Sequence, residues 1–534
     1  DACGQVKCVG SAAELPGAGL ADLHRPAVDQ VTWACAACEH GTMRREPFVL
    51  DCWFDSGCAP CAAAGHDASE PEAHAADFVC EGSDQTRGWF YNMLAVAAGL
   101  ATQRPAMPPF RTVLTVGVML DKHGHKMSKS KGNAVEPAPL FAASGVDATR
   151  WYLASRAAPW TPARYDPQGP FKANNNVFRR LWNLHQLLLT FGDGHRLPEL
   201  APVTASSPAM AHPLDRWLLS RAAAVVADVS ANYESFNFQR VTQSLQDFVL
   251  HDLSKFYAMN AKQRLHPRQL ARNMATALAP DEDVLACLQT FKTVLLVVCR
   301  LMAPLAPFMP DHLHRQLTDG QSVHLAPWPT PEELPAASQE LEAQVALARD
   351  VLEVGRRLRQ ECGRPGPLPC RMLTLVDAPD AARVDLTALY PLLTEQLNCC
   401  AVQAAPAGFE PAQPAATAKL NSGAVLCFDL SVSPDLQSRC DARALYKAVQ
   451  DQRKQLGFAD SAHGSVRLAL AFVGAPAASA LPVHPADLRL LQQDSRAAAV
   501  TVAVVSDAAP QPGTKVALTN DAACWVHVVP ADDD

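Results

Sequence analysis

The sequence predicts an α/β fold over about the first 170 residues, a bundle of α-helices after it, and a small α+β region at the end. Three observations support this order. Short apolar runs alternate with helix-length segments at the start, apolar residues recur at steps of three and four in the middle, and period-two apolar runs return near the end. At 534 residues the chain is too long for one hydrophobic core, so several domains are expected.

The first predicted domain covers residues 1–170 and mixes strands with helices. The run TVLTVGVML at 112–120 is apolar, rich in β-branched residues and of strand length. The segment TRGWFYNMLAVAAGLA at 86–101 has the length and composition of a helix with a wide buried face. Strands and helices that alternate in this way are typical of α/β layers.

The second predicted domain, residues 171–330, is helical. Four apolar residues recur at helical spacing and share one face: Val177, Leu181, Leu184 and Leu188. The most apolar stretch of the chain, FKTVLLVVCRLMA at 291–303, is interrupted by Lys292 and Arg300. It therefore indicates a buried amphipathic helix, and no membrane span is predicted.

Proline clusters mark the boundary to the third predicted domain, residues 331–534: MAPLAPFMP at 302–310 is expected to close the bundle, and APWPTPEELP at 326–335 is expected to be a loop. A helix is expected at 338–361, and another is expected to stop at Gly457. Apolar residues at period two predict strands in SVRLALAFV and AVTVAVVSD. The sequence shows no internal repeat, and these features indicate one or two small α+β domains.

Charge and cysteine content exclude some classes of protein. The formal net charge is −8, which argues against coating of nucleic acid by the whole surface and leaves local basic patches. The 17 cysteines lack the spacing of a small secreted disulfide scaffold, so a reducing compartment, the cytoplasm, is expected. Because the chain starts at Asp1 without methionine or a signal-peptide pattern, we expect a fragment with an upstream part missing.

The stretch HKMSKSKGN, residues 125–133, combines three lysines with two serines. It follows the predicted strand at 112–120 and the turn DKHGH, and ligands of open α/β sheets bind where strands end. Positioned cations there would stabilise the charge that develops on a pyrophosphate leaving group, and a mobile loop suits a site that closes on a nucleotide. The alternative is a solvated basic surface loop.

Sequence motifs then point to a family. KMSKS at 126–130 resembles the signature loop of class I aminoacyl-tRNA synthetases, and DCWFDSG (51–57) and EGSDQTRGWF (81–90) are similar to segments that mark the isoleucyl-tRNA synthetases. The resemblance is close up to about residue 360 and loose beyond it. It implies the C-terminal half of a Rossmann-like nucleotide fold, then a helical anticodon-binding domain and a C-terminal α+β tRNA-contact or junction region.

The same resemblance implies roles for the lysine loop. Lys129 is expected to contact the phosphates of ATP and to stabilise the transition state, while Lys126 anchors the loop or assists. Ser128 and Ser130 are expected to shape the loop and to contact phosphate.

The segment EGSDQTRGWF offers acceptor groups before a predicted helix N-terminus, where they can take an amino group and ribose hydroxyls. By resemblance Glu81 binds the adenylate, Asp84 and Gln85 help to hold it, and Trp53 and Trp89 shape the isoleucine pocket. The alternatives are a helix cap for the acidic run and core packing for the tryptophans.

The segment KFYAMNAKQRLHPRQLARN at 255–273 combines basic residues with a tyrosine expected to be exposed, which suits RNA backbone contact and base stacking. Its candidate tRNA contacts are Lys255, Lys262 and Arg264, with Arg268 and Arg272 beyond. A solvated helix face is the alternative.

Four cysteines near the start form a candidate zinc site, because some relatives carry a structural zinc in this region. They are Cys3, Cys8, Cys35 and Cys38. The alternative is a set of buried thiols without metal.

The resemblance implies ATP-dependent attachment of isoleucine to tRNA(Ile) through an isoleucyl-adenylate, with Mg²⁺ accompanying the ATP and no membrane partner. The family's first ATP signature and its editing domain do not occur in this sequence, so an upstream half is expected to complete the active site. A valine–tRNA ligase is the rival within the class, and EGSDQTRGWF argues against it. A non-catalytic tRNA-binding derivative is the second rival, and the presence of Glu81, Gln85, Trp89 and Lys129 argues against that.

Overall fold

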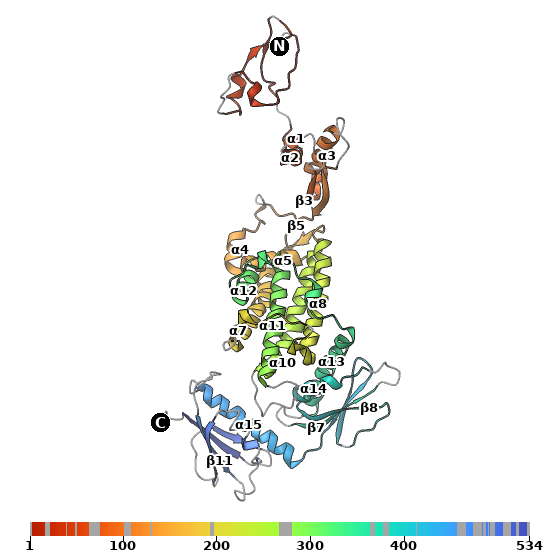
Figure 1. The fold of residues 1–534 in the computed structure, drawn as a ribbon, viewed down its shortest axis with the longest axis vertical. Helices are drawn as coiled ribbons and strands as arrows, with labels where there is room; N and C mark the ends of the chain where they lie inside the picture. Colours follow the sequence, from red (N-terminus) through yellow and green to blue (C-terminus); the bar gives the residue numbers. More distant parts are fainter. Residues whose placement is uncertain are drawn as a thin grey trace. The chain divides into compact units, whose positions relative to one another are not determined.

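The structure is a computed structural model of the chain (Figure 1). It describes all residues except 1–2, 17–21, 39, 49–50, 64–74, 101–107, 129–130, 193–196, 205, 266–279, 364–368, 378–383, 413, 456–465, 474–482, 484–486, 490, 492–496, 506–513, 519–522 and 531–534. Two compact units are present: residues 1–120 with 159–163, and residues 121–158 with 164–534. The domain boundaries predicted near residues 170 and 330 stay predictions.

The first unit starts with short elements: the 3-10 turns η1 (Ala12–Glu14) and η2 (Val28–Gln30) and the antiparallel pair β1 (Trp33–Ala34) and β2 (Thr42–Met43). Its α/β part contains α1 (Cys52–Gly57), α2 (Ala59–Ala63), β3 (Ala76–Gly82), η4 (Ser83–Arg87), α3 (Trp89–Leu100), β4 (Phe110–Val116) and β5 (Met119–Leu120). Strands β3 and β4 run parallel, and α3 lies between them in the sequence. Their shared core is formed by Val79, Phe90 and Met93. The predicted α/β class is confirmed.

Two predicted elements of this unit end differently in the structure. The strand predicted at 112–120 is split, because Gly117 N donates to Pro159 O (2.7 Å) and leaves the ladder with β3. A side chain at Gly117 would collide with the backbone of Thr161, so this crossing requires glycine. The helix predicted at 86–101 begins at Trp89, since a 3-10 turn occupies the residues before it.

The second unit is dominated by the predicted helix bundle. Its elements up to residue 361 are α4 (Pro137–Ser144), α5 (Val146–Ser155), α6 (Gly169–Ala173), the π-helical η6 (Asn174–Phe178), α7 (Arg179–Phe191), η7 (Leu197–Glu199), η8 (Pro208–Ala211), α8 (Pro213–Glu234), α9 (Phe238–Asp247), the π-helical η9 (Phe248–Tyr257), α10 (Ala258–Leu265), α11 (Pro280–Met302), α12 (Met309–Leu317), η10 (Val323–Leu325), η11 (Pro331–Glu333) and α13 (Gln339–Glu361). A short strand β6 (Ala163–Arg164) lies where the two units meet in the sequence.

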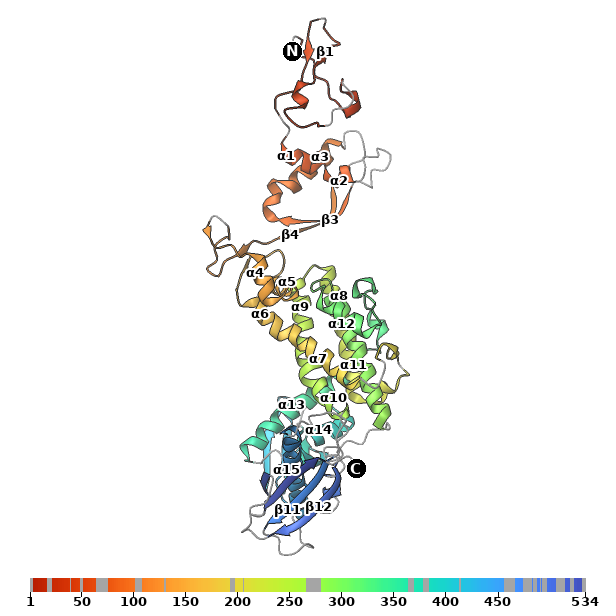
Figure 2. The ribbon, with the colours of Figure 1, turned by 90° about the vertical axis from the view of Figure 1, so that its left-hand side faces the viewer.

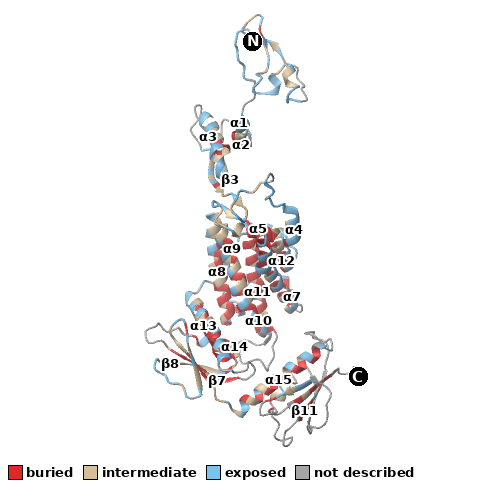
Figure 3. Cartoon of the chain, turned by 180° about the vertical axis from the view of Figure 1, so that it is seen from behind, coloured by how far each residue is buried: buried red, intermediate tan, exposed pale blue. Residues whose placement is uncertain are grey.

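Burial in the bundle follows the predicted helix face. Side chains in this part of the chain are largely buried where the helices face one another (Figure 3). The predicted face is confirmed, because its four members are at most 3% exposed: Val177, Leu181, Leu184 and Leu188. The helix predicted at 338–361 is confirmed as α13.

Helix α11 is a long apolar helix of the bundle. Of the helices that the structure describes, it is the one whose length and composition would allow a membrane crossing, but 67% of its apolar window is buried inside the protein. It packs against α8 in the middle of the bundle (Figures 1 and 2). The ammonium group of Lys292 donates to the carbonyls of Pro198 (3.0 Å) and Leu200 (2.9 Å), which satisfies two of its three N–H donors. The prediction of a buried amphipathic helix is confirmed.

The segment after the lysine loop is fixed to the bundle by polar contacts. Asp147 of α5 accepts hydrogen bonds from Phe308 N (3.2 Å) and Met309 N (2.6 Å), at the start of α12. Arg150 donates to the carbonyls of Leu305 (2.9 Å) and Pro304 (3.3 Å). Because α5 follows the loop after only a short helix, these contacts set the position of the loop's C-terminal end. The bundle also continues through α12, beyond the proline cluster expected to close it.

The C-terminal region contains two four-stranded sheets. The first has the order β8-β7-β10-β9 and is built from β7 (Cys370–Val376), η12 (Thr387–Leu389), α14 (Tyr390–Gln396), β8 (Cys399–Ala405), β9 (Ala415–Lys419) and β10 (Val425–Asp429). The second has the order β12-β11-β14-β13 and follows α15 (Pro434–Gln455) with β11 (Val466–Val473), β12 (Ala497–Val505), β13 (Thr514–Ala517) and β14 (Ala523–Pro530). The predicted α+β character is therefore present twice; Gly457 lies outside the described residues.

The two sheets have the same topology. In each, the first two strands are parallel, the fourth is antiparallel to the first, and the third is antiparallel to the fourth. A long helix precedes each sheet and packs on its last two strands: α13 on β9 and β10, and α15 on β13 and β14. Figure 2 shows α15 lying against its sheet. The region is a structural repeat that the sequence pattern did not reveal.

Candidate functional site

The acidic run of the first unit lies at the end of a parallel strand. Glu81 is the penultimate residue of β3 and pairs in register with Thr115 of β4, and its side chain is exposed. The carboxyl ends of parallel strands are the edge where ligands bind in α/β folds. Asp84 is also exposed and belongs to the 3-10 turn that follows. Both exposed carboxylates therefore lie at or just after the carboxyl end of β3.

Gln85 has a structural contact in addition to its predicted role. Its Oε1 accepts a hydrogen bond from Trp89 N (2.8 Å) and so caps the first turn of α3. The cap needs glycine at position 88, because a Cβ on Gly88 would lie 2.5 Å from Oε1 of Gln85. The helix cap, which was the alternative to a ligand-binding role, is thus present for Gln85. The amide nitrogen of Gln85 can still donate a hydrogen bond to a ligand.

The two tryptophans lie beside this turn. Trp89 is half-buried, and its Nε1 donates to Ser56 O (2.9 Å), which connects α3 to α1. Trp53 of α1 is 37% exposed, and its ring lies 3.6 Å from the position that a Cβ would take on Gly88. Neither tryptophan is a fully buried core residue, so both rings have area available to a ligand.

A cavity that the sequence did not predict lies between α1, α2 and α3. Its volume is about 540 Å³, and its lining is mostly apolar and includes Phe54, Cys58, Cys61, Asn92 and Val96. Trp53 and Trp89 do not line it, so it is distinct from the predicted amino-acid pocket.

The lysine loop is a turn closed by side chains, in the second unit. Asp121 Oδ1 accepts from the backbone N–H groups of His123 and His125 (both 2.9 Å), and Gly124 occupies the left-handed region at φ 89°. Lys126 is exposed and Ser128 half-buried. The hydrogen bonds from His125 and Asn133 lower the pKa of Asp121 to about 2, so this carboxylate is ionised at neutral pH.

The predicted catalytic Lys129 and its neighbour Ser130 lie outside the described residues. Their roles stay predictions. On the flanks of these two residues, Lys126 and Lys131 are exposed, and neither forms an ion pair with a carboxylate in the part of the chain that the structure describes.

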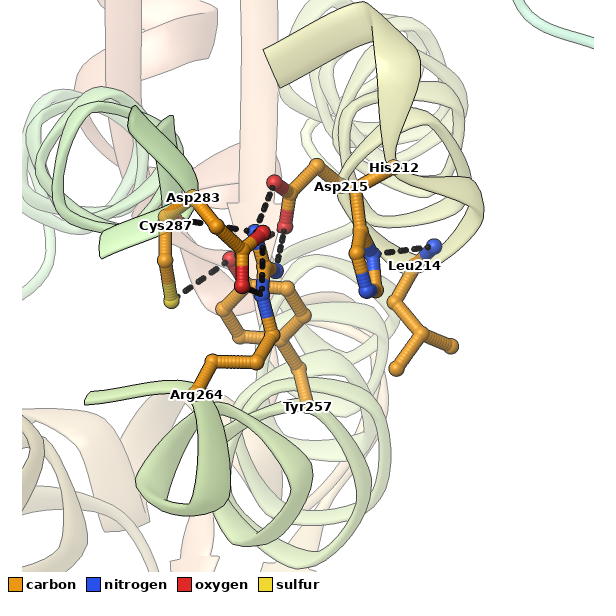
Figure 4. Close-up of polar contacts among 7 residues, drawn as sticks. All are labelled: His212, Leu214, Asp215, Tyr257, Arg264, Asp283 and Cys287. Carbon is orange, nitrogen blue, oxygen red and sulfur yellow. Dashed lines mark hydrogen bonds and ion pairs between the residues drawn. The ribbon is translucent and has the colours of Figure 1, made fainter. Parts of the chain in front are cut away.

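Arg264, predicted to contact tRNA, is buried in the bundle. Its guanidinium is 5% exposed and binds two buried carboxylates, with Nη1 2.6 Å from Asp215 Oδ1 and Nη2 2.7 Å from Asp283 Oδ1 (Figure 4). Tyr257, expected to be exposed, donates from its hydroxyl to Asp215 (2.7 Å) inside the same cluster. Tyr257 is 1% exposed, so the prediction that it is exposed is wrong. The Arg264 guanidinium is engaged by the two buried carboxylates instead of lying on the exposed surface where an RNA contact was predicted.

We call this cluster the Arg264 network; its members are Asp215 of α8, Tyr257 of η9, Arg264 of α10, and Asp283 and Cys287 of α11. Burial and the nearby carboxylate raise the pKa of Tyr257 well above its usual value, and burial raises that of Cys287 to about 12, so both stay protonated. Arg264 stays charged between the two carboxylates. The network ties α8 and α11 to the adjoining elements η9 and α10, and it holds the Arg264 guanidinium inside the bundle.

The other predicted tRNA contacts differ from Arg264 in exposure. Lys255 and Lys262 are both exposed. Arg268 and Arg272 lie outside the described residues. The basic surface near the end of α10 is therefore smaller than the sequence indicated.

Three of the four candidate zinc ligands meet in the first unit. The sulfur atoms of Cys3, Cys35 and Cys38 all lie within 4.8 Å of one another, with 3.6 Å between those of Cys3 and Cys35. Cys35 and Cys38 lie in the loop that joins β1 to β2, where Cys35 N donates to Gly41 O (2.8 Å). Cys8 is exposed and is not part of this group, so the structure brings together three of the four predicted ligands, and the place of Cys8 in the set stays a prediction.

Comparison with known proteins gives the family. Residues 7–161 match the model of tRNA synthetases class I (I, L, M and V), and residues 215–374 match the anticodon-binding domain of tRNA ligase. Isoleucine–tRNA ligase of Methanothrix thermoacetophila is 34% identical over 424 residues, which cover 77% of this chain and 38% of that protein. The chain belongs to the class I tRNA synthetases.

One further relative and one solved structure are also similar to the chain. Isoleucine–tRNA ligase of Deinococcus radiodurans is 36% identical over 375 residues, covering 67% of this chain and 32% of that protein. A solved ternary complex of Agrobacterium radiobacter K84 agnB2 LeuRS, tRNA and LeuAMS aligns with 57% of this chain and 35% of that chain, at 21% identity and a TM-score of 0.45. This class I synthetase chain spans less than half the length of the relatives it matches.

Proposed function

We propose that the chain is part of an isoleucine–tRNA ligase that works in the cytoplasm. Isoleucine attacks the α-phosphate of ATP, which is bound with Mg²⁺, and gives isoleucyl-adenylate and pyrophosphate. A ribose hydroxyl of the terminal adenosine of tRNA(Ile) then takes the acyl group. The observation that carries the proposal is the similarity to an isoleucine–tRNA ligase over 77% of the chain, together with the class I synthetase match over residues 7–161, which contain Glu81 and the lysine loop.

The first unit supplies groups suited to an aminoacyl-adenylate. The carboxylates of Glu81 and Asp84 can accept hydrogen bonds from an ammonium group and from ribose hydroxyls at the strand end. The exposed faces of Trp53 and Trp89 supply an apolar wall for a branched aliphatic side chain. Because α3 is connected to α1 through Trp89, the two rings are held at a fixed separation.

The lysine loop supplies positive charge for the leaving pyrophosphate. Lys129 is proposed to contact the phosphates directly, with Lys126, Ser128 and Ser130 shaping the loop or assisting. The exposed ammonium groups of Lys126 and Lys131 add positive charge to this loop.

The α/β part of the first unit is suited to association with further strands. A parallel sheet of two strands is rarely stable alone, and parallel sheets are normally covered on both faces. Here Phe78 of β3 is 46% exposed and Val113 of β4 is 42% exposed. We therefore propose that an upstream half of the same enzyme completes this sheet and, with it, the ATP site.

The two rival functions receive less support. The relatives reported above are isoleucine–tRNA ligases rather than valine–tRNA ligases. A non-catalytic tRNA-binding derivative would have no need to keep the acceptors and tryptophans beside β3, whereas Glu81, Gln85 and Trp89 are all present.

The test is amino-acid-dependent exchange of pyrophosphate into ATP by the complete enzyme that contains this chain. Isoleucine is expected to support the fastest exchange, with valine slower by about 10- to 200-fold because the two side chains differ by one methylene. Leucine and methionine serve as further comparisons. Exchange that is fastest with valine would favour the first rival, and binding of tRNA without exchange would favour the second.

For the tRNA, we propose backbone contacts from Lys255 and Lys262 on the helical region that matches an anticodon-binding domain. Arg264 is not included, because its donors are engaged inside the bundle.

We also propose a structural zinc held by Cys3, Cys35 and Cys38. Three thiolates at these separations fit three corners of a tetrahedral site with Zn–S distances of about 2.3 Å. The pair Cys35 and Cys38 on a tight loop after a strand is typical of such sites. Bound metal would crosslink the first residues of the chain to the β1–β2 hairpin.

Cobalt titration of the chain tests the metal site. We expect thiolate-to-cobalt charge-transfer absorption at one equivalent, lost in Cys35→Ser and retained in Cys8→Ser, the matched exposed cysteine. Equal loss in both variants, or no absorption in the wild type, would contradict the site.

A further inference from the structure

Two side chains lie at the two ends of the lysine loop and bind each other. Asp121 precedes the loop and is 16% exposed; Asn133 ends it and is half-buried. The Nδ2 of Asn133 donates to Asp121 Oδ2 (3.0 Å). This hydrogen bond joins the two ends of the segment 121–133, which contains the loop. The other carboxylate oxygen of Asp121 is engaged by backbone N–H groups of His123 and His125.

Asn133 also binds the loop backbone from inside. Its Oδ1 accepts from Ser128 N (2.9 Å), and its Nδ2 lies 3.4 Å from the carbonyl of Lys126. One carboxamide thus contacts the backbone at two loop residues and the side chain of Asp121 at the other end. Neither group has been assigned a role above.

We propose that Asp121 and Asn133 form a clasp that holds the lysine loop in the shape required for amino-acid activation. This inference rests on the proposed function. Both are positioning residues, because they act through the backbone of Lys126 and Ser128 rather than by touching ATP.

The physical need for a clasp follows from the loop's composition. Its exposed lysines repel one another, and a loop of this length loses backbone entropy when it is ordered on a nucleotide. The hydrogen bonds of Asp121 and Asn133 form in the absence of ATP. They order part of the loop in advance, so less backbone entropy is lost when the loop binds the nucleotide and isoleucine is activated. A carboxylate that stays ionised at neutral pH makes the clasp independent of pH in the physiological range.

The first experiment measures the shape of the loop without reference to catalysis. Limited trypsin digestion of the chain is followed by mass spectrometry of cleavage after Lys126 and Lys131. Loss of the hydrogen bonds in Asn133→Ala is expected to speed cleavage there by about tenfold. The matched control is Asn421→Ala, which removes another exposed Asn–Asp contact (Asn421 Nδ2 to Asp350 Oδ1, 2.7 Å) far along the sequence and should leave cleavage at the loop unchanged.

The second experiment measures activation in the complete enzyme. Asn133→Ala and Asp121→Asn are expected to lower kcat for isoleucine-dependent pyrophosphate exchange by about tenfold or more, with the KM for isoleucine unchanged. Transfer of isoleucine from preformed adenylate to tRNA should not change. A residue that merely stabilised the fold would affect both steps alike.

A swap of the two side chains gives the sharpest test. Asp121→Asn alone places an amide donor opposite the donor of Asn133, whereas Asp121→Asn combined with Asn133→Asp restores one donor and one acceptor. The double variant is expected to recover most of the exchange activity lost in the single variant.

The outcomes separate the two proposals. Wild-type cleavage in Asn133→Ala would overturn the clasp, and faster cleavage with unchanged exchange would overturn its positioning role. If the wild-type enzyme itself shows no exchange with any amino acid, the proposed function fails, and this inference fails with it.

Discussion

Replacing Arg264 with alanine is expected to destabilise the helix bundle by about 3–5 kcal/mol, because two buried carboxylates would lose their counter-charge. Asp215 and Asp283 are at most 1% exposed, so water cannot take the place of the guanidinium without opening the bundle. The measurement is urea unfolding of the chain followed by circular dichroism at 222 nm, with attention to the transition of the helical part.

Arg357→Ala is the matched control. Its ion pair with Glu361 spans 3.9 Å between side chains that are 61% and 63% exposed. The free energy of unfolding is expected to fall by at most about 0.5 kcal/mol, as for other exposed ion pairs one helical turn apart. A similar loss in both variants would show that burial does not govern the energetics of the Arg264 network.

A triple variant keeps the prediction testable if Arg264→Ala does not fold. Arg264→Met combined with Asp215→Asn and Asp283→Asn removes all three charges at similar volume, and it is expected to recover most of the lost stability. A normal fold in Arg264→Ala, together with a raised KM for tRNA, would instead restore the prediction that Arg264 contacts RNA.

Lys129→Ala is expected to lower the rate of isoleucine-dependent pyrophosphate exchange by about 10²- to 10³-fold, with little change in the KM for isoleucine. A cation on the β- and γ-phosphates interacts most strongly when the bond to the leaving pyrophosphate breaks, so its loss affects the transition state more than the bound substrates. The measurement is exchange by the complete enzyme at saturating ATP.

Two matched variants define what the result means. Lys122→Ala removes an exposed lysine from the turn just before the loop. It should change the rate by less than threefold, because it alters the local electrostatic potential without removing a direct contact with phosphate. Lys129→Arg keeps the charge with a different shape and should recover part of the rate. Equal rates in the wild type and in Lys129→Ala would remove Lys129 from the mechanism.

Periodic patterns in the sequence predicted most of the fold. The buried face with Leu181 and Leu188, the helix α13 and the central α11 all follow from the spacing of apolar residues, which is a local property. The family motifs likewise identified two candidate site segments: EGSDQTRGWF, which contains Glu81, and KMSKS, which contains Lys126. These features need no knowledge of distant contacts.

The errors have a common physical origin. Arg264 looked exposed because arginine usually is, but its partners Asp215 and Asp283 are 49 and 19 residues away in the sequence. The pairing of Cys3 with Cys35 over 32 residues, without Cys8, is equally non-local. Polar partners that meet only after folding leave no periodic signal, so a sequence pattern cannot choose among them.

The clasp was also missed for this reason, although Asn133 belonged to a recognised string. The pattern identified KGN as part of the motif, but only the fold shows that its asparagine reaches back twelve residues to Asp121.

The repeated topology at the end of the chain has a consequence for biosynthesis. Two neighbouring sheets with one strand order could exchange strands while the ribosome is still producing the second, and such misassembly is a typical failure of tandem modules. The two sheets carry different core residues, for example Val376 and Cys427 in one and Leu470 and Phe472 in the other, and such differences work against the exchange of strands. Divergence between the two modules would thus be favoured by selection for faithful folding, and a variant in which the second module copies the first should aggregate during expression.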